Sequence, residues 1–204
     1  MSYVVAVAAP IGGGKTSVVR AVAHELGDAT TIHYDCYEKA TAKPVQDLKR
    51  WIEGGADINE FRVPELSRDL EMLKRGTSVM EPMTGREIAP RKYIVFEMPL
   101  GKEHRDTAGY IDLLIWIDLP LDIALARKLK EFTRDFLTEY GPEKHKDCIT
   151  WLDHYLENYL AVVRDALEIQ QQRVPEHADV IIDGRASVPA IVQQATRAIL
   201  DRLP

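Results

Sequence analysis

A glycine-rich turn followed by lysine and threonine is the segment of this sequence with the most specific chemistry. It reads A-P-I-G-G-G-K-T from Ala9 to Thr16, which fits the phosphate-binding pattern G-x-x-x-x-G-K-[ST] at every position but the first. Glycines let backbone N–H groups surround phosphate oxygens, Lys15 would neutralise the outer phosphates, and the Thr16 hydroxyl would bind Mg²⁺. We therefore predict a nucleoside triphosphate site made of Ile11, Gly12, Gly13, Gly14, Lys15, Thr16 and Ser17.

A dinucleotide-binding turn is the competing interpretation of the same glycines. Asp35 lies near the spacing at which such folds have their ribose-binding acid. However, the sequence has no G-x-G-x-x-G, because the third residue after Gly14 is Ser17. Lys15 and Thr16 would also have no role in that turn, so the triphosphate site is favoured.

Two carboxylates come at the ends of apolar segments that read as strands. Asp35 follows residues 30–34 and Glu97 follows residues 93–96. The carboxyl ends of parallel strands meet at one edge of a sheet, so these acids can converge with Thr16 as hard oxygen ligands for Mg²⁺. Transfer of phosphate to an alcohol also needs a carboxylate that orients the hydroxyl and takes its proton. We predict Thr16, Asp35 and Glu97 as metal ligands and Asp35 as that base.

Short apolar runs alternate with helical periodicity along the whole chain. The runs at 3–9, 30–34, 93–96, 111–119 and 178–182 are predicted strands, separated by amphipathic helical segments that include one at 123–137 and one at 149–167. Strands that alternate with helices predict a three-layer α/β fold with a five-stranded parallel sheet and helices on both faces. The three tryptophans lie on apolar stripes and are expected in the core: Trp51, Trp116 and Trp151.

Composition excludes several classes of function. The sequence has 26 Lys and Arg residues and 32 Asp and Glu residues, which give a net charge of −6. This charge argues against a protein that binds nucleic acid or an anionic membrane through a basic face. No apolar run approaches the roughly 18 residues of a membrane helix. Two cysteines cannot form a disulfide framework. We therefore expect one cytoplasmic domain over residues 1–204, without nucleic-acid or membrane partners.

The charged segment after the fourth predicted strand is a candidate lid. Phosphoryl transfer needs cations that close over the transferred group, and Arg127 and Arg134 are seven residues apart, so one helical face can present both. We predict a lid over about 127–150 in which these two arginines act on the phosphate. A solvated helix face is the alternative, because acids such as Glu131 and Asp135 alternate with the basic residues.

Taken together, these segments resemble the uridine kinase and phosphoribulokinase branch of the P-loop kinases. The loop A-P-I-G-G-G-K-T-S resembles that family's G-x-S-x-S-G-K-[ST], I-H-Y-D-C-Y resembles its Q-D-x-F-Y, and Y-I-V-F-E-M-P resembles its strand ending in E-G. The resemblance implies the P-loop NTPase fold with a short helical lid, and an ATP- and Mg²⁺-dependent kinase. It implies Asp35 as catalytic base, Glu97 as the magnesium-associated acid, and an acceptor-binding segment over about 36–90 that includes Tyr37.

The sequence departs from the family pattern where the acceptor would bind. Arg62 stands where the family keeps a ribose-contacting aspartate, Met83 replaces an aromatic residue, and Arg134-Asp135 lacks the following R-G-R. An arginine can pair bidentately with a carboxylate or a phosphate. We therefore expect Arg62 to bind substrate and the acceptor to be a small hydroxyl compound with a negative group. A surface role for Arg62, a nucleotide kinase and a non-catalytic nucleotide-binding switch remain the alternatives.

Overall fold

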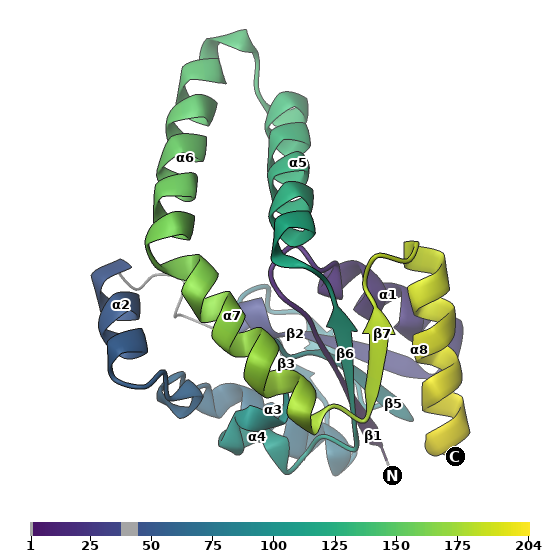
Figure 1. Cartoon of the computed structure of the whole chain (residues 1–204). Coiled ribbons are helices and arrows are strands. Elements are labelled where there is room, and N and C mark those ends of the chain that lie inside the picture. Colours follow the sequence, from purple (N-terminus) through teal and green to yellow (C-terminus); the bar gives the residue numbers. More distant parts are fainter. Residues whose placement is uncertain (1, 38–44) are drawn as a thin grey trace.

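The computed structural model describes residues 2–37 and 45–204. At its centre is a parallel sheet of five strands in the order β2-β5-β1-β6-β7 (Figure 1). The predicted sheet is confirmed, and every predicted strand agrees with the observed one to within two residues at each end. The strands are β1 (Tyr3–Ala8), β2 (Ala29–His33), β5 (Tyr93–Glu97), β6 (Leu113–Asp118) and β7 (Val180–Asp183).

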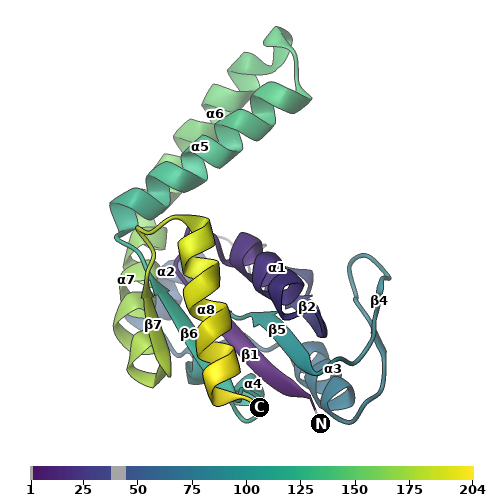
Figure 2. The ribbon, with the colours of Figure 1, turned by 90° about the vertical axis from the view of Figure 1, so that its right-hand side faces the viewer.

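Helices cover both faces of the sheet, which explains the unbroken apolar run of β1. Its side chains alternate between two cores: Val4 and Ala6 pack on one face, and Val5 and Val7 on the other. Helices α1 (Lys15–Leu26) and α8 (Val188–Arg202) cover the second face, whereas α3 (Pro64–Lys74), α4 (Arg105–Ala108) and α7 (Arg164–Arg173) lie on the first (Figure 2). Each large aliphatic side chain fully buried in these layers stabilises the fold by about 1.5–3 kcal/mol.

Helices α5 (Leu121–Glu139) and α6 (His145–Asn158) form a hairpin that projects from the body of the molecule (Figures 1 and 2). Its inner contact is a stack of Phe132 on Trp151, with ring centroids 3.4 Å apart. The prediction of a core position is therefore wrong for Trp151, which is 38% exposed, because its apolar stripe faces the partner helix and not the sheet. Trp116 is buried as predicted, whereas Trp51 is only partly buried.

A π-helical segment connects the hairpin to the body. The helix predicted over 149–167 is observed as α6, the five-residue π-helix Tyr159–Val163, and α7. An extra residue per turn shifts the helical register, and Figure 1 shows that the chain bends there. The bend lets α6 rise away from the sheet while α7 lies along it.

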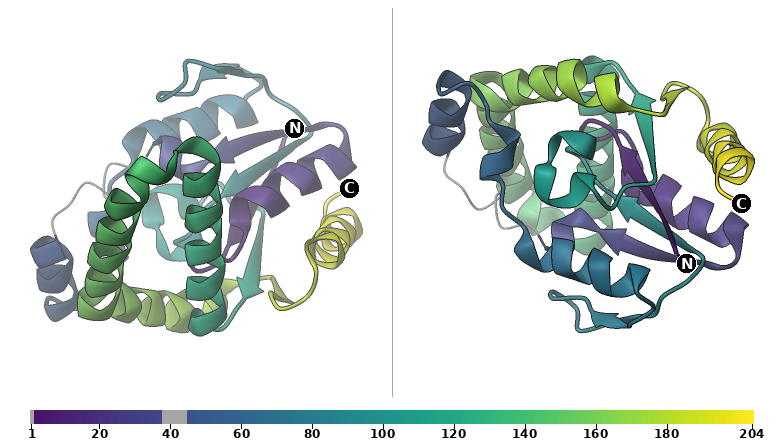
Figure 3. Two further views of the ribbon diagram at one scale, coloured as in Figure 1. Left: turned by 90° about the horizontal axis from the view of Figure 1, so that it is seen from above. Right: turned by 90° about the horizontal axis from the view of Figure 1, so that it is seen from below.

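A small two-stranded ribbon borders the sheet edge formed by β2. Strands β3 (Val79–Met80) and β4 (Glu87–Ile88) form this antiparallel ribbon beside α3, whereas α2 (Val45–Glu53) lies away from it and contacts the π-helical segment Tyr159–Val163 (Figure 3). The sequence did not predict this ribbon, because two-residue strands show no periodicity. Part of the predicted acceptor segment, residues 38–44, lies outside the described residues. Over 2–37 and 45–204, no helix is both long and apolar enough to span a membrane.

Candidate active site

The predicted phosphate loop connects β1 to α1 at the carboxyl edge of the sheet. Its backbone needs glycine at two points: Gly12 and Gly14 have φ values of 77° and 78°, which side chains rarely allow. A Cβ on Gly12 would also collide with the carbonyl oxygen of Ala124 in α5. The loop therefore passes close under the base of the hairpin, with its N–H groups and the N-terminus of α1 available to an anion.

The Lys15 ammonium turns back onto its own loop. Its Nζ donates to the carbonyl oxygens of Ala9 and Pro10, at 3.1 and 3.3 Å. Burial lowers the pKa of Lys15, while the nearby carboxylates of Glu97 and Asp35 act in the opposite direction. A cation held in a loop of backbone N–H groups is the arrangement that receives the outer phosphates of a nucleoside triphosphate.

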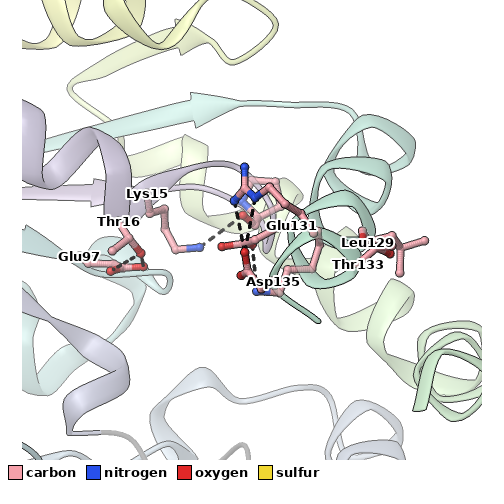
Figure 4. A network of polar contacts seen from close by, with 10 residues as sticks. Lys15, Thr16, Glu97, Leu129, Glu131, Thr133 and Asp135 are labelled. Atoms are coloured by element: carbon pink, nitrogen blue, oxygen red, sulfur yellow. Dashed lines mark hydrogen bonds and ion pairs between the residues drawn. The ribbon is translucent and has the colours of Figure 1, made fainter. Parts of the chain in front are cut away.

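Thr16 and Glu97 lie directly opposite one another, as Figure 4 shows. The Thr16 hydroxyl is 3.2 and 3.1 Å from the two carboxylate oxygens of Glu97, and His33 Nδ1 is 3.1 Å from Oε2. Burial raises the pKa of Glu97, but the hydrogen bond from His33, the charge of Lys15 and the hydrogen bond from Thr16 outweigh it, so the pKa lies below its ordinary value. A charged carboxylate beside a hydroxyl is an oxygen ligand set that fits Mg²⁺.

Two adjoining cavities meet at these residues. The first has a volume of about 370 Å³ and the second about 680 Å³, and both are lined by Thr16, Asp35 and Glu97. Asp35 is exposed at the end of β2 and makes no hydrogen bond or ion pair with the rest of the described chain. Its carboxylate is therefore free to accept a hydrogen bond from a molecule in either cavity.

The first cavity runs from the phosphate loop to the base of the hairpin. All the residues predicted to bind the triphosphate line it, from Ile11 to Ser17. Arg127 and Arg134 line it too, although Arg127 Nη1 donates to the Gly184 carbonyl at 3.0 Å and Arg134 pairs with Asp135 on the exposed helix face. Lys128 and Glu131 of the same helix also line this cavity.

The second cavity lies between the carboxyl end of β2 and the β3–β4 ribbon. Its lining includes His33 and the ribbon residues Glu81, Thr84 and Arg86, together with Arg20 of α1. Burial raises the pKa of Glu81, but hydrogen bonds from Thr84 and Arg86 outweigh it and lower the pKa below its ordinary value. No periodic pattern in the sequence predicts that these residues line a cavity.

Known kinases are similar to this chain in sequence and in structure. No protein-family model matches the chain. The chain is 25% identical over 202 residues to a uridine kinase of Halobacterium salinarum (strain ATCC 700922 / JCM 11081 / NRC-1), covering 93% of this chain and 84% of that protein. A possible uridine kinase from Bacillus stearothermophilus has a similar structure, with a TM-score of 0.56, 12% identity and 89% of each chain covered.

Two other solved structures share the architecture. Shikimate kinase from Acinetobacter baumannii, in complex with shikimate, matches 98% of this chain and 94% of its own, with a TM-score of 0.52 and 17% identity. A gluconokinase from Sinorhizobium meliloti 1021 matches 99% and 93%, with a TM-score of 0.52 and 15% identity. The chain has the fold of the P-loop kinases. The predicted fold and the predicted resemblance are confirmed, and these relatives support the prediction of an ATP-dependent small-molecule kinase.

Two residues predicted to bind the acceptor lie elsewhere in this P-loop kinase fold. The hydroxyl of Tyr37 donates to the buried carboxylate of Asp69 at 3.0 Å, which joins the end of β2 to α3. The side chain of Arg62 is 69% exposed and pairs with Asp106 at 2.8 Å. Neither residue lines either cavity, so the residues brought together at the site are those of the loop, the strand ends and the hairpin.

Proposed function

We propose that this chain is a kinase that transfers the γ-phosphate of ATP, with Mg²⁺, to a hydroxyl group of a small molecule. The observation that carries the proposal is the pair of cavities that share Thr16, Asp35 and Glu97. Phosphoryl transfer needs a donor and an acceptor that approach in line across one point. Two cavities that join at a hydroxyl and two carboxylates supply that arrangement.

ATP would occupy the first cavity. The loop from Ile11 to Ser17 would bind its phosphates through backbone N–H groups, and the Lys15 ammonium would neutralise the outer phosphates. The cavity continues to Arg127 and the 45% exposed side chain of Val188, where an apolar and a cationic surface suit a nucleobase. Arg134 is the proposed lid cation for the transferred group.

Thr16, Glu97 and Asp35 are the residues that would hold Mg²⁺ through oxygen atoms. When bound, the ion would neutralise the charge of the β- and γ-phosphate oxygens. His33 donates to Glu97 and so orients the carboxylate toward Thr16. Asp35 is the proposed base: it would accept the hydrogen bond of the acceptor hydroxyl and take its proton as the new O–P bond forms.

The acceptor would occupy the second cavity. We propose that the acceptor carries a negative group, as expected from the positions where the sequence departs from the family pattern. Arg20 and Arg86 are better placed than Arg62 to bind that group. Arg20 has no carboxylate partner within the described residues, and Arg86 uses only Nη2 in its contacts with Glu81 and Thr31. Tyr37 would act by holding the end of β2. The proposed compartment is the cytoplasm, where ATP is abundant and thiols stay reduced.

A screen of matched acceptors tests this function. ADP formation is measured with Mg²⁺ and ATP in the presence of glucose or gluconate, glycerol or glycerate, and uridine, with uridine monophosphate as the acceptor that a nucleotide kinase would use. The proposal expects ADP release that depends on one of the hydroxyl compounds, with the acidic member of a pair preferred. Turnover of neutral members alone would refute the negative group. If no compound raises ADP release above the basal rate, the kinase proposal fails and a nucleotide-binding switch is favoured.

A further inference from the structure

His33 uses only one of its two ring nitrogens within the described residues. Nδ1 lies 3.1 Å from Oε2 of Glu97, and the two residues are paired neighbours on β2 and β5. The pKa of Glu97 lies below its ordinary value, so its carboxylate is charged and can only accept a hydrogen bond. Nδ1 therefore carries a proton and donates it. Nε2, on the opposite edge of the ring, has no hydrogen-bond partner in the parts of the chain that the structure describes.

Nε2 belongs to a side chain that lines the second cavity. His33 shares this lining with Asp35, the proposed base, which lies two residues further along the chain. The His33 side chain is only 13% exposed, so little bulk water surrounds its ring. A ring nitrogen in this position is a hydrogen-bonding group that a molecule in the cavity can satisfy. A hydroxyl fits best, because it can donate to a neutral imidazole and accept from a protonated one.

We propose that His33 Nε2 binds a second hydroxyl of the acceptor, beside the hydroxyl that Asp35 receives. The inference rests on the proposed function and narrows its substrate class. Arg20 and Arg86 line the same cavity, so the acceptor that fits this lining carries a negative group and at least two hydroxyls. It is a polyhydroxy acid. A site that binds a substrate hydroxyl discriminates against an analogue that lacks it.

The test compares the affinity of glycerate, the smallest acid with two hydroxyls, with the affinities of lactate and 3-hydroxypropionate, which each lack one hydroxyl. Binding is measured by calorimetry in the presence of Mg²⁺ and a non-hydrolysable ATP analogue. Wild type is expected to bind glycerate about three- to tenfold more tightly than either analogue, which is the factor that one hydrogen bond contributes. Equal affinities, or no binding of glycerate, would overturn the inference.

Two substitutions assign this preference to Nε2. His33→Asn keeps an amide near the position of Nδ1 and has no group at Nε2, so glycerate is expected to bind within about twofold of the better-bound analogue. His33→Gln places its amide near the position of Nε2 and is expected to keep the preference, whereas a purely structural role would affect both variants alike. His177→Asn is the matched control, because His177 also pairs with a glutamate, Glu103 at 2.7 Å, but lines neither cavity. This variant is expected to bind all three acids as wild type does.

The outcomes separate the contact at His33 from the proposed function. A preference for glycerate that both His33 variants lose, or that both keep, would overturn the inference. His33→Ser replaces the asparagine variant if circular dichroism shows that the latter is unfolded. ADP release with uridine and none with glycerate refutes the inference and leaves the kinase. Preferential binding of glycerate without ADP release from any acceptor refutes the kinase and leaves the contact at His33.

Discussion

Asp35→Asn is the change that most sharply separates transfer to a hydroxyl from other uses of this fold. The side chain is exposed and makes no hydrogen bond with the described chain, so its replacement by an amide of the same shape is expected to change the free energy of unfolding by no more than about 0.5 kcal/mol. Loss of a general base lowers the rate by about 10²–10⁴-fold, which corresponds to about 3–5 kcal/mol of activation free energy. A large loss of kcat with unchanged stability is therefore expected.

The assay is acceptor-dependent ADP release under saturating ATP, together with urea unfolding of the same preparations. Asp118→Asn is the control, since Asp118 is likewise an exposed strand-end aspartate but lines neither cavity. Its kcat is expected to remain within about twofold of wild type. If Asp35→Asn lowers kcat by less than tenfold, Asp35 is not the base, and an acceptor that is already a phosphate, as in a nucleotide kinase, becomes the better interpretation.

Three further changes probe the surroundings of the site. Gly12→Ala places a methyl group against the Ala124 carbonyl and is expected to cost about 2 kcal/mol or more of stability in urea unfolding; unchanged stability would contradict the close approach of loop and hairpin. Glu97→Gln is expected to lower stability by about 1–3 kcal/mol at pH 7. Because the pKa of Glu97 is depressed below 4.5 in the folded protein, this difference should be fully present above about pH 5 and shrink as the pH falls through the folded pKa; a constant difference at every pH would refute it. Trp151→Ala removes the stack on Phe132 and should speed hydrogen exchange in α5 and α6 but not in the sheet; faster exchange in the sheet as well would contradict an independent hairpin.

The sheet and the phosphate loop could be predicted from the sequence for physical reasons. A parallel strand covered on both faces must be apolar throughout, so runs such as Tyr3–Ala8 and Leu113–Asp118 are visible without other information. The loop could be predicted because its backbone passes close to Ala124 with a positive φ at Gly12, and few residues other than glycine fit there. The positions of Thr16 and Glu97 followed, since strand ends and helix starts meet at one edge.

The remaining parts of the site have no comparable pattern in the sequence from which they could be predicted. The β3–β4 ribbon has two residues per strand, too few for an alternating pattern, so the ribbon was not foreseen, although it lies within the predicted acceptor segment over about 36–90. Trp151 follows the same apolar periodicity in a projecting hairpin as it would in a helix on the sheet.

The measurement closest to the central claim is the affinity of the purified protein for ATP, with and without Mg²⁺, for wild type and Lys15→Ala. The account predicts binding that Mg²⁺ strengthens and that the substitution weakens by about tenfold or more, because a charge-assisted contact to phosphate is lost. ATP affinity that does not respond to Mg²⁺, or that is the same after Lys15→Ala, would contradict it.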